Sequence, residues 1–177
     1  MKRSSLFPTT RELCVAAFLT ALSVIIGIFC KNFLNFGNGL FRITFENLPI
    51  ILSGFLFGPI VGALVGAASD LLSYLLSAQT YPPNLVVTAG AAAIGLISGI
   101  FYRFVFRKRS IALRTVLSGG LAHVIGSMLI KTVGLYQYYG IAVLVRIPLY
   151  VLVATIEIAL LLYLFKQKSF HKLIDTL

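Results

Sequence analysis

The stretch RITFENLPIILSGFLFGPIVGALVGAASDLLSY, residues 42–74, decides the fold of this chain. Its central run from Asn47 to Ser69 carries no charge and is broken by the pair Gly58-Pro59. Pro59 has no amide hydrogen and suits a first helical turn, whereas Gly58 can take a left-handed cap. The stretch therefore predicts a short helix, a tight Gly-Pro turn and a longer helix, both inside a bilayer.

Residues spaced by four define one face of the longer helix: Gly62, Gly66, Asp70 and Tyr74. The two glycines allow a neighbouring helix to come close, and the same face then becomes polar. A carboxylate in hydrocarbon costs about 2.5–3.5 kcal/mol even on a lenient insertion scale. We therefore expect Asp70 to belong to a functional site.

The composition indicates an all-α integral membrane protein that forms a single domain over residues 1–177. Hydrophobic residues make up 59% of the chain and charged residues 11%, and the mean hydropathy is +0.98. The net charge of +10 does not indicate a nucleic-acid partner, because the basic residues gather at the ends of apolar runs, where membrane topology explains them. We expect a multi-pass protein of a cell membrane, such as a bacterial plasma membrane.

The apolar runs predict the transmembrane helices and the loops between them. The expected helices cover about residues 13–30, 44–57, 59–78, 84–102, 115–130 and 146–165. Thr10 is the expected cap of the first helix. Segment 31–41 is expected to be a loop because it is rich in Asn and Gly, and segment 134–140, which reads GLYQYYG, is expected to be another.

Charge decides between five and six spans. Splitting the central stretch at Gly58-Pro59 gives six transmembrane helices with both termini in the cytoplasm. That side then carries 11 of the 15 basic residues, as the positive-inside rule requires. These are Lys2, Arg3, Arg11, Arg103, Arg107, Lys108, Arg109, Arg114, Lys166, Lys168 and Lys172.

Four basic residues remain on the outer side: Lys31, Arg42, Lys131 and Arg146. One interpretation is that they reach toward lipid phosphates at the membrane surface. The other is a ring of cations that gathers an anionic ligand. Arg42 and Arg146 are the strongest candidates, because a guanidinium binds a carboxylate through two parallel hydrogen bonds.

Three acids lie at membrane depth, namely Glu46, Asp70 and Glu157. Glu46 follows Arg42 by four residues, so it either forms an ion pair within a helix or belongs to the site. Asp70 can accept two hydrogen bonds from an amino-pyrimidine edge. Glu157 lies deeper, and we interpret it as structural or protonated.

Aromatic side chains gather at the same outer rim. They include Tyr74 and Tyr136, which belong either to an interfacial aromatic belt or to the walls of a ligand pocket.

The sequence contains no pattern that predicts catalysis, a cofactor or a metal ion. His123 is alone in its span, and we interpret it as a packing residue. No G-x-x-x-x-G-K-[ST] motif occurs, so the chain is not expected to bind ATP in the manner of a P-loop. No nucleophile elbow occurs either, and we expect a protein that is not an enzyme.

Three segments carry a resemblance to a known family. They are RITFENLPIILSGFLFGPIVGALVGAASDLLSYLL (42–76), YPPNLVVTAGAAAIGLISG (81–99) and RIPLYVLVATIEI (146–158). The chain resembles the folate-specific substrate-binding (S) subunits of energy-coupling factor (ECF) vitamin transporters. The resemblance extends from about residue 13 to 165, and FGPIVGALVGAASDLL is its most specific part.

The resemblance implies six helices, a vitamin pocket in the outer half and no ATPase activity. It also implies docking on a transmembrane coupling subunit, joined to two ATPase subunits, through an A-x-x-x-A face on the first helix. Ala17 and Ala21 match that face, although ordinary helix packing also explains such a pair.

Folate fits these candidate residues. Its glutamate tail offers two carboxylates to the outer cations, and its pterin edge offers donors to Asp70 or Asn84. The expected substrate-binding residues are Arg42, Glu46, Asp70, Tyr74, Asn84, Lys131, Tyr136 and Arg146.

The sequence leaves two alternatives open. Pantothenate or riboflavin can replace folate on the same kind of fold, whereas cationic thiamine is the vitamin least consistent with four outer cations. The second alternative is a self-sufficient ion-coupled carrier in which Asp70 and Glu157 relay protons.

Overall fold

The computed structural model describes residues 9–36, 41–77 and 83–167. These residues are helical except for two short strands, their connecting turns and the ends of the described segments. The helices are α1 (Thr10–Phe33), α2 (Asn47–Phe57), α3 (Pro59–Leu76), α4 (Leu85–Ile100), α5 (Ile111–Ala122), α6 (Thr132–Tyr139) and α7 (Arg146–Lys166). Two π-helices, η1 (Phe101–Val105) and η2 (His123–Lys131), and a 3₁₀-helix, η3 (Gly140–Val145), join some of them. Strands β1 (Asn35–Phe36) and β2 (Phe41–Arg42) pair antiparallel.

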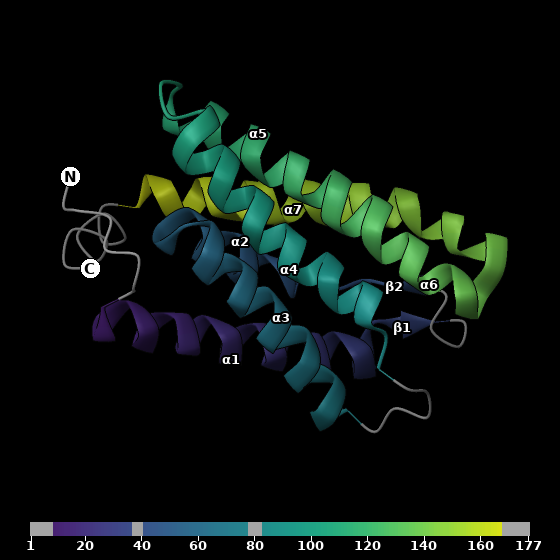
Figure 1. Ribbon diagram of the computed structural model, residues 1–177. Helices are drawn as coiled ribbons and strands as arrows, with labels where there is room; N and C mark the ends of the chain where they lie inside the picture. Colours follow the sequence, from purple (N-terminus) through teal and green to yellow (C-terminus); the bar gives the residue numbers. More distant parts are fainter. Residues whose placement is uncertain (1–8, 37–40, 78–82, 168–177) are drawn as a thin grey trace.

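The helices run back and forth between two ends of the molecule (Figure 1). The start of α1, the turn between α2 and α3, and the end of α7 lie at one end. The β1–β2 pair and α6 lie at the other end. The continuous helical segment 111–166 folds back at η3, so that α7 returns along α5 and contacts it.

The expected turn between the second and third helices is confirmed. Gly58 has φ +98°, which favours glycine, and Pro59 is the first residue of α3. The guanidinium of Arg103 donates a hydrogen bond to the carbonyl of Leu56 in the last turn of α2. A cation therefore lies at the carboxyl end of α2, where the helix dipole favours positive charge.

Glycines bring α3 and α4 into close contact. A Cβ atom placed on Gly95 of α4 would overlap the carbonyl oxygen of Gly62 in α3. One placed on Gly66 would overlap the carbonyl oxygen of Ala91 in the same way. The expected role of Gly62 and Gly66 in helix packing is therefore confirmed.

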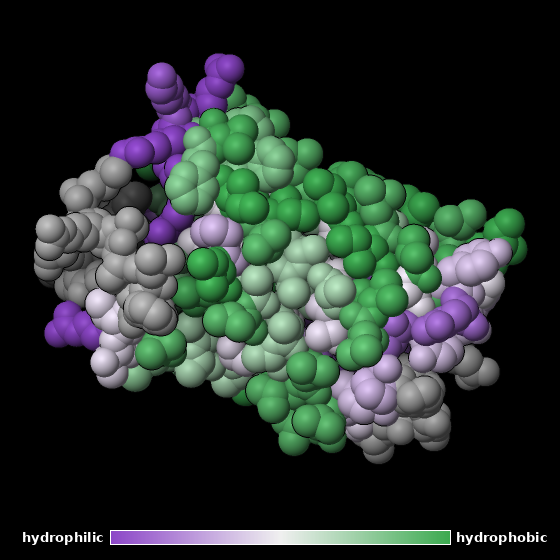
Figure 2. Space-filling view, viewed as in Figure 1, coloured by the Kyte–Doolittle hydropathy of each residue, from purple (hydrophilic) through white to green (hydrophobic). Residues whose placement is uncertain are grey.

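The surface has the apolar band of a membrane protein. Figure 2 shows hydrophobic residues over the middle of the visible face and hydrophilic residues gathered at its two ends. Within the described residues, four helical segments are long and apolar enough to cross a bilayer. They are Thr10–Phe33, Pro59–Leu76, Leu85–Val105 and the folded-back segment Ile111–Lys166; Asn47–Phe57 is a shorter apolar helix.

Three sequence-based expectations are wrong. Thr9, not Thr10, caps α1: its hydroxyl accepts a hydrogen bond from the Glu12 amide, and the Glu12 carboxylate accepts one from the Thr9 amide. The first expected loop begins too early, because α1 continues to Phe33. The second expected loop, 134–140, is helical through Tyr139 as part of α6.

Candidate functional site

A cavity of about 50 Å³ lies among the helices, between the segment that follows β2 and the first half of α7. Its wall is formed by Thr44, Glu46, Asn47, Asp70, Val87, His123, Ser127, Lys131, Leu135, Arg146, Tyr150 and Val153. Sites for ligands of drug size generally measure about 300 Å³ or more. Entry of such a ligand therefore requires the walls to move apart.

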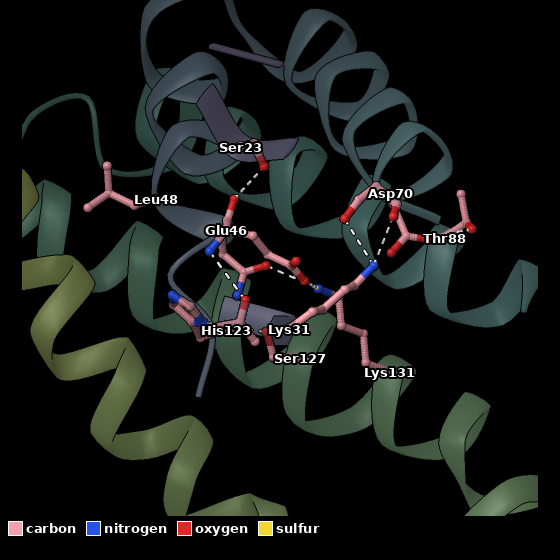
Figure 3. A network of polar contacts seen from close by, with 12 residues as sticks. Ser23, Lys31, Glu46, Leu48, Asp70, Thr88, His123, Ser127 and Lys131 are labelled. Atoms are coloured by element: carbon pink, nitrogen blue, oxygen red, sulfur yellow. Dashed lines mark hydrogen bonds and ion pairs between the residues drawn. The ribbon is translucent and has the colours of Figure 1, made fainter. Parts of the chain in front are cut away.

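Lys131, the last residue of η2, brings a buried cation to the cavity. Lys131 is only 6% exposed. The ammonium donates a hydrogen bond to Oδ1 of Asn47 at 3.1 Å and lies 3.4 Å from Oε1 of Glu46. Figure 3 shows Lys131 and Glu46 directed toward each other from opposite sides of the cavity. A ligand carboxylate can compete with Glu46 for this ammonium.

Arg146 brings a second buried cation from the start of α7. It is also 6% exposed, and its guanidinium lies over the ring of Tyr139, 4.7 Å from the ring centre. Stacking on an aromatic face limits the orientations of the planar guanidinium. The arginine is thereby held ready for a planar anion such as a carboxylate.

Asp70 lies on α3 and is oriented by a neighbour on α4. The hydroxyl of Thr88 donates a hydrogen bond to Oδ2 of Asp70 at 2.7 Å. The carboxylate accepts without donating, so its remaining lone pairs suit N–H donors of a ligand. The spacing of four residues from Gly66 brings Asp70 to the cavity wall, as its place on the polar part of that face predicts.

A fully buried pair forms the deep end of the site. Nε2 of His123 lies 2.8 Å from Oε2 of Glu157, and the two side chains are 1% and 0% exposed. The other oxygen of Glu157, Oε1, accepts a hydrogen bond from the Leu48 amide at 3.1 Å. His123 lines the cavity, whereas Glu157 stands behind it.

The π-helix η2 supplies three cavity residues at intervals of four: His123, Ser127 and Lys131. Wide helical turns of this kind occur frequently at functional sites. Nothing in the stretch HVIGSMLIK predicts a π-helix instead of an α-helix. The spacing of four between His123, Ser127 and Lys131 does predict that the three share one helix face, and the sequence analysis did not use that spacing.

Four of the eight expected substrate-binding residues meet at the cavity: Glu46, Asp70, Lys131 and Arg146. Three others lie outside its wall. Asn84 caps α4 by accepting hydrogen bonds from the amides of Val86 and Val87, and its amide group donates to the carbonyl of Gly134. Tyr74 is half-buried on α3, and Tyr136 on α6 is 59% exposed.

Arg42 lies in β2, and its side chain is outside the described part of the structure. Arg42 and Glu46 do not share a helix, as one of the two interpretations of Glu46 requires, because α2 begins only at Asn47. The carboxylate of Glu46 faces Lys131 across the cavity. Glu46 lies immediately before α2, so its side chain is not fixed on a face of that helix.

Lys31, another of the outer cations, supports the fold. Its ammonium donates hydrogen bonds to the carbonyl and the hydroxyl of Ser73, at 3.1 and 3.0 Å, near the end of α3. Ala17 and Ala21, the expected docking residues, are both exposed on α1. Within the described segments, no group of three metal-ligating side chains comes together.

Comparison with protein families gives one family that matches over residues 7–168, described as "ECF-type riboflavin transporter, S component". Among curated proteins, the folate transporter FolT of Clostridium novyi is 29% identical over 128 residues, which is 72% of this chain and 69% of that protein. An uncharacterized protein of Mycoplasma pneumoniae is 40% identical over 60 residues, which is 34% of this chain but only 12% of that protein.

A solved structure gives the same fold. The crystal structure of FolT bound with folic acid superposes with a TM-score of 0.67 at 24% sequence identity. The match covers 89% of this chain and 93% of the FolT chain. The arrangement of helices around the cavity is therefore that of a known membrane-protein fold.

Proposed function

Because the chain belongs to the family of S components of ECF-type transporters, we propose that it is the folate-binding subunit of a vitamin uptake system. It is a multi-pass protein of the bacterial cell membrane. It captures folate on the outer side and passes it inward together with partner subunits. The curated relative named as a folate transporter supports folate as the substrate.

One observation carries the choice of substrate: two basic residues, Lys131 and Arg146, line one cavity and are each 6% exposed. Carboxylates form strong, charge-assisted hydrogen bonds with ammonium and guanidinium groups. Folate brings two carboxylates on its glutamate tail, one for each cation. The tail then displaces Glu46 from Lys131, and the heterocyclic edge donates to Asp70.

Riboflavin is the alternative that the family description raises. Its ribityl chain carries no charge, so it leaves both cations without a new counterion. Pantothenate carries one carboxylate and satisfies one cation. Thiamine is cationic and is repelled by Lys131 and Arg146, which makes it the least suitable vitamin.

The anion-binding role has a direct test with the purified protein in detergent. Folate and its dimethyl ester, whose tail is uncharged, are titrated into wild type and Arg146→Ala. We expect the variant to bind folate at least tenfold more weakly and to bind the ester as the wild type does. Equal losses for the two ligands would contradict a role of Arg146 in binding the tail.

We infer six transmembrane helices in one domain, with both termini in the cytoplasm. The start of α1 and the end of α7 lie at the same end of the molecule as the α2–α3 turn (Figure 1). The long segment Ile111–Lys166 folds back and supplies two crossings, and the shorter α2 supplies the sixth. The cavity then lies in the outer half, where Lys131 and Arg146 begin or end their helices.

The proposed partners are a transmembrane coupling subunit and two ATPase subunits, as the family membership implies. The chain has no P-loop motif, so ATP hydrolysis must come from the other subunits. Ala17 and Ala21 are exposed on α1 and offer a flat surface to a partner helix. This subunit itself binds and carries its ligand without chemical conversion.

The docking surface is tested by Ala17→Leu and Ala21→Leu, which place bulk on that surface. Co-purification with the coupling subunit should be lost while folate affinity stays within twofold. Ala112→Leu, at an exposed position on α5, is the matched control and should co-purify normally. Retained assembly in both α1 variants would contradict the docking role.

The ion-coupled carrier is a different class of protein that also uses buried acids. Proteoliposomes that contain this chain alone distinguish the two. We expect no folate accumulation under an imposed proton gradient, and accumulation only when the partners and ATP are present. Gradient-driven uptake by the isolated chain, abolished by Asp70→Asn, would establish the carrier instead.

A further inference from the structure

A short turn joins η1 to α5 and lies at the same end of the molecule as the start of α1 and the end of α7 (Figure 1). The Arg109 amide donates a hydrogen bond to the Phe106 carbonyl at 2.9 Å, so the turn is tight. Ser110 then caps α5 by accepting a hydrogen bond from the Leu113 amide. The consecutive residues Lys108 and Arg109 lie in this turn, and both are exposed. We call these two residues the basic tip.

Two other cations of the same segment are already engaged by the protein. Arg103 donates a hydrogen bond to the carbonyl of Leu56. Arg114 donates to the carbonyl of Tyr102 and lies over its ring, 3.8 Å from the ring centre. These half-buried arginines therefore hold the turn against the rest of the bundle.

The basic tip differs from these arginines because its neighbours supply no counterion. Among the described residues, neither of its side chains pairs with a carboxylate. The sequence contains no Asp or Glu between Asp70 and Glu157, a stretch that includes α4, η1, α5 and η2. α5 packs against these elements and against α7, whose acid Glu157 is fully buried. A lasting negative partner for the basic tip therefore comes from outside these elements.

Exposed apolar side chains lie next to the basic tip on both sides along the chain. Phe104 and Val105 of η1 are 68% and 54% exposed, and Ile111, the first residue of α5, is 49% exposed. Figure 2 shows hydrophobic surface that reaches the hydrophilic residues at this end of the molecule. Cations beside an apolar surface are complementary to a phospholipid, which carries a phosphate beside its acyl chains.

We propose that the basic tip binds the phosphate of an anionic phospholipid in the cytoplasmic leaflet, while Phe104, Val105 and Ile111 contact its acyl chains. Ammonium and guanidinium groups form charge-assisted hydrogen bonds with phosphate, and anionic lipids attract basic residues at the membrane surface. The location in the cytoplasmic leaflet rests on the topology inferred above. The proposal does not depend on the vitamin, because the cavity lies near the other end of the molecule, where α6 contributes to its wall (Figure 1).

An acidic surface on a partner protein is the other source of negative charge. The proposed docking helix α1 lies on the opposite side of the bundle from α5 (Figure 1). A partner that docks on α1 therefore leaves the basic tip facing the membrane. This arrangement favours a lipid over a protein at the basic tip.

Native mass spectrometry of the purified protein in detergent tests lipid binding directly. The protein is titrated with phosphatidylglycerol and, in parallel, with phosphatidylcholine, whose headgroup has no net charge. We expect saturable binding of phosphatidylglycerol and binding of phosphatidylcholine that is at least tenfold weaker. Equal binding of the two lipids would overturn the proposal.

The double variant Lys108→Gln with Arg109→Gln removes both charges of the basic tip. We expect its affinity for phosphatidylglycerol to fall at least tenfold, while its folate affinity stays within twofold of wild type. The matched control is Arg11→Gln with Lys166→Gln, which removes two exposed charges at the same end of the molecule. The control should bind phosphatidylglycerol within twofold of wild type. Equal losses in the two double variants would indicate attraction by net charge alone and overturn the site.

Glycerol phosphate and inorganic phosphate distinguish a lipid from a free anion. Both carry a phosphate without acyl chains, so neither should displace phosphatidylglycerol at an equal concentration. Displacement by either would show a site for a free anion and overturn the lipid.

The outcomes also separate this inference from the proposed function. Folate binding without preference for phosphatidylglycerol would overturn the inference and leave the folate function standing. Binding of phosphatidylglycerol at the basic tip, without binding of folate, would overturn the substrate and support the inference.

Discussion

Three charged side chains in the cavity wall, Lys131, Asp70 and Arg146, each have a neighbour that limits their direction. Lys131 is held by Asn47 and Glu46, and the carboxylate of Asp70 is held by Thr88. Arg146 is held by the ring of Tyr139. Side chains that are already held in place lose little conformational freedom when the ligand binds, and this raises the affinity. Neighbours that never touch the ligand should therefore affect its binding.

Arg146→Lys tests the geometry of the cation separately from its charge. Lysine keeps the positive charge but loses the planar fork and its stacking on Tyr139. We expect folate affinity to fall about tenfold, equivalent to about 1.4 kcal/mol. Calorimetric titration measures it. Wild-type affinity in this variant would show that charge alone suffices.

Thr88→Val tests the positioning of Asp70. The change removes the hydroxyl that donates to Oδ2 and keeps the shape of the side chain. A hydrogen bond to a charged group contributes about 1.5–3 kcal/mol, so we expect folate binding to weaken about tenfold or more, as measured by the same titration.

The matched control is Thr155→Val, which removes an exposed hydroxyl on α7 that bonds only within its own helix. In a background of Asp70→Asn, Thr88→Val should add little further loss. Full additivity of the two changes would contradict the coupling of Thr88 to Asp70.

Part of the site could be predicted from residue chemistry alone. The cost of a charge at membrane depth pointed to Asp70, and the positive-inside rule pointed to Lys131 and Arg146 as exceptions; the three meet at the cavity. Neither argument says which way an aromatic residue faces. Tyr74 and Tyr136 share the outer rim but lie outside the cavity wall, because a helix face drifts with tilt and packing.

At the scale of the helices, backbone contact between α3 and α4 holds the wall that carries Asp70 and Thr88. Gly95→Ala tests this contact, because its new methyl group would overlap the carbonyl of Gly62. Over-packing of this kind costs about 1–3 kcal/mol. We expect a lower melting temperature in detergent and weaker folate binding.

Gly120→Ala, on α5, is the control for this prediction. A Cβ atom at Gly120 meets no other atom within 4 Å, and alanine favours the helix by about 1 kcal/mol. Its melting temperature should be unchanged or higher. Equal destabilisation by the two substitutions would contradict the importance of the α3–α4 contact.

The helical elements were predictable where local rules agree with packing. The local preferences of Gly58 and Pro59 favour a turn, and the fold places a turn there, so the α2–α3 junction was predicted correctly. Gly134 misled the prediction of a loop at 134–140. Because Gly134 has no side chain, α6 can pack closely against Val86 and Val87 of α4, and the Gly134 carbonyl accepts a hydrogen bond from the Asn84 amide group. The glycine therefore allows helix packing and does not form a turn. Such a contact depends on a distant segment.

At the scale of the whole molecule, the six-helix topology makes a prediction about accessibility. In a background with Cys14 and Cys30 changed to Ser, single cysteines are placed at Arg109, Tyr136 and Lys166, all exposed positions. An impermeant maleimide applied to intact cells should label Tyr136→Cys only. The other two should react after permeabilisation. Labelling of Arg109→Cys in intact cells would support five spans and contradict six.

We propose that this chain alone binds folate through two buried cations, Lys131 and Arg146. The most direct measurement is calorimetric titration of the purified chain, without partner subunits, with folate and in parallel with riboflavin. We predict saturable one-to-one binding of folate and none of riboflavin. Saturable binding of riboflavin without folate would contradict the substrate, and binding of neither vitamin would contradict the proposed site.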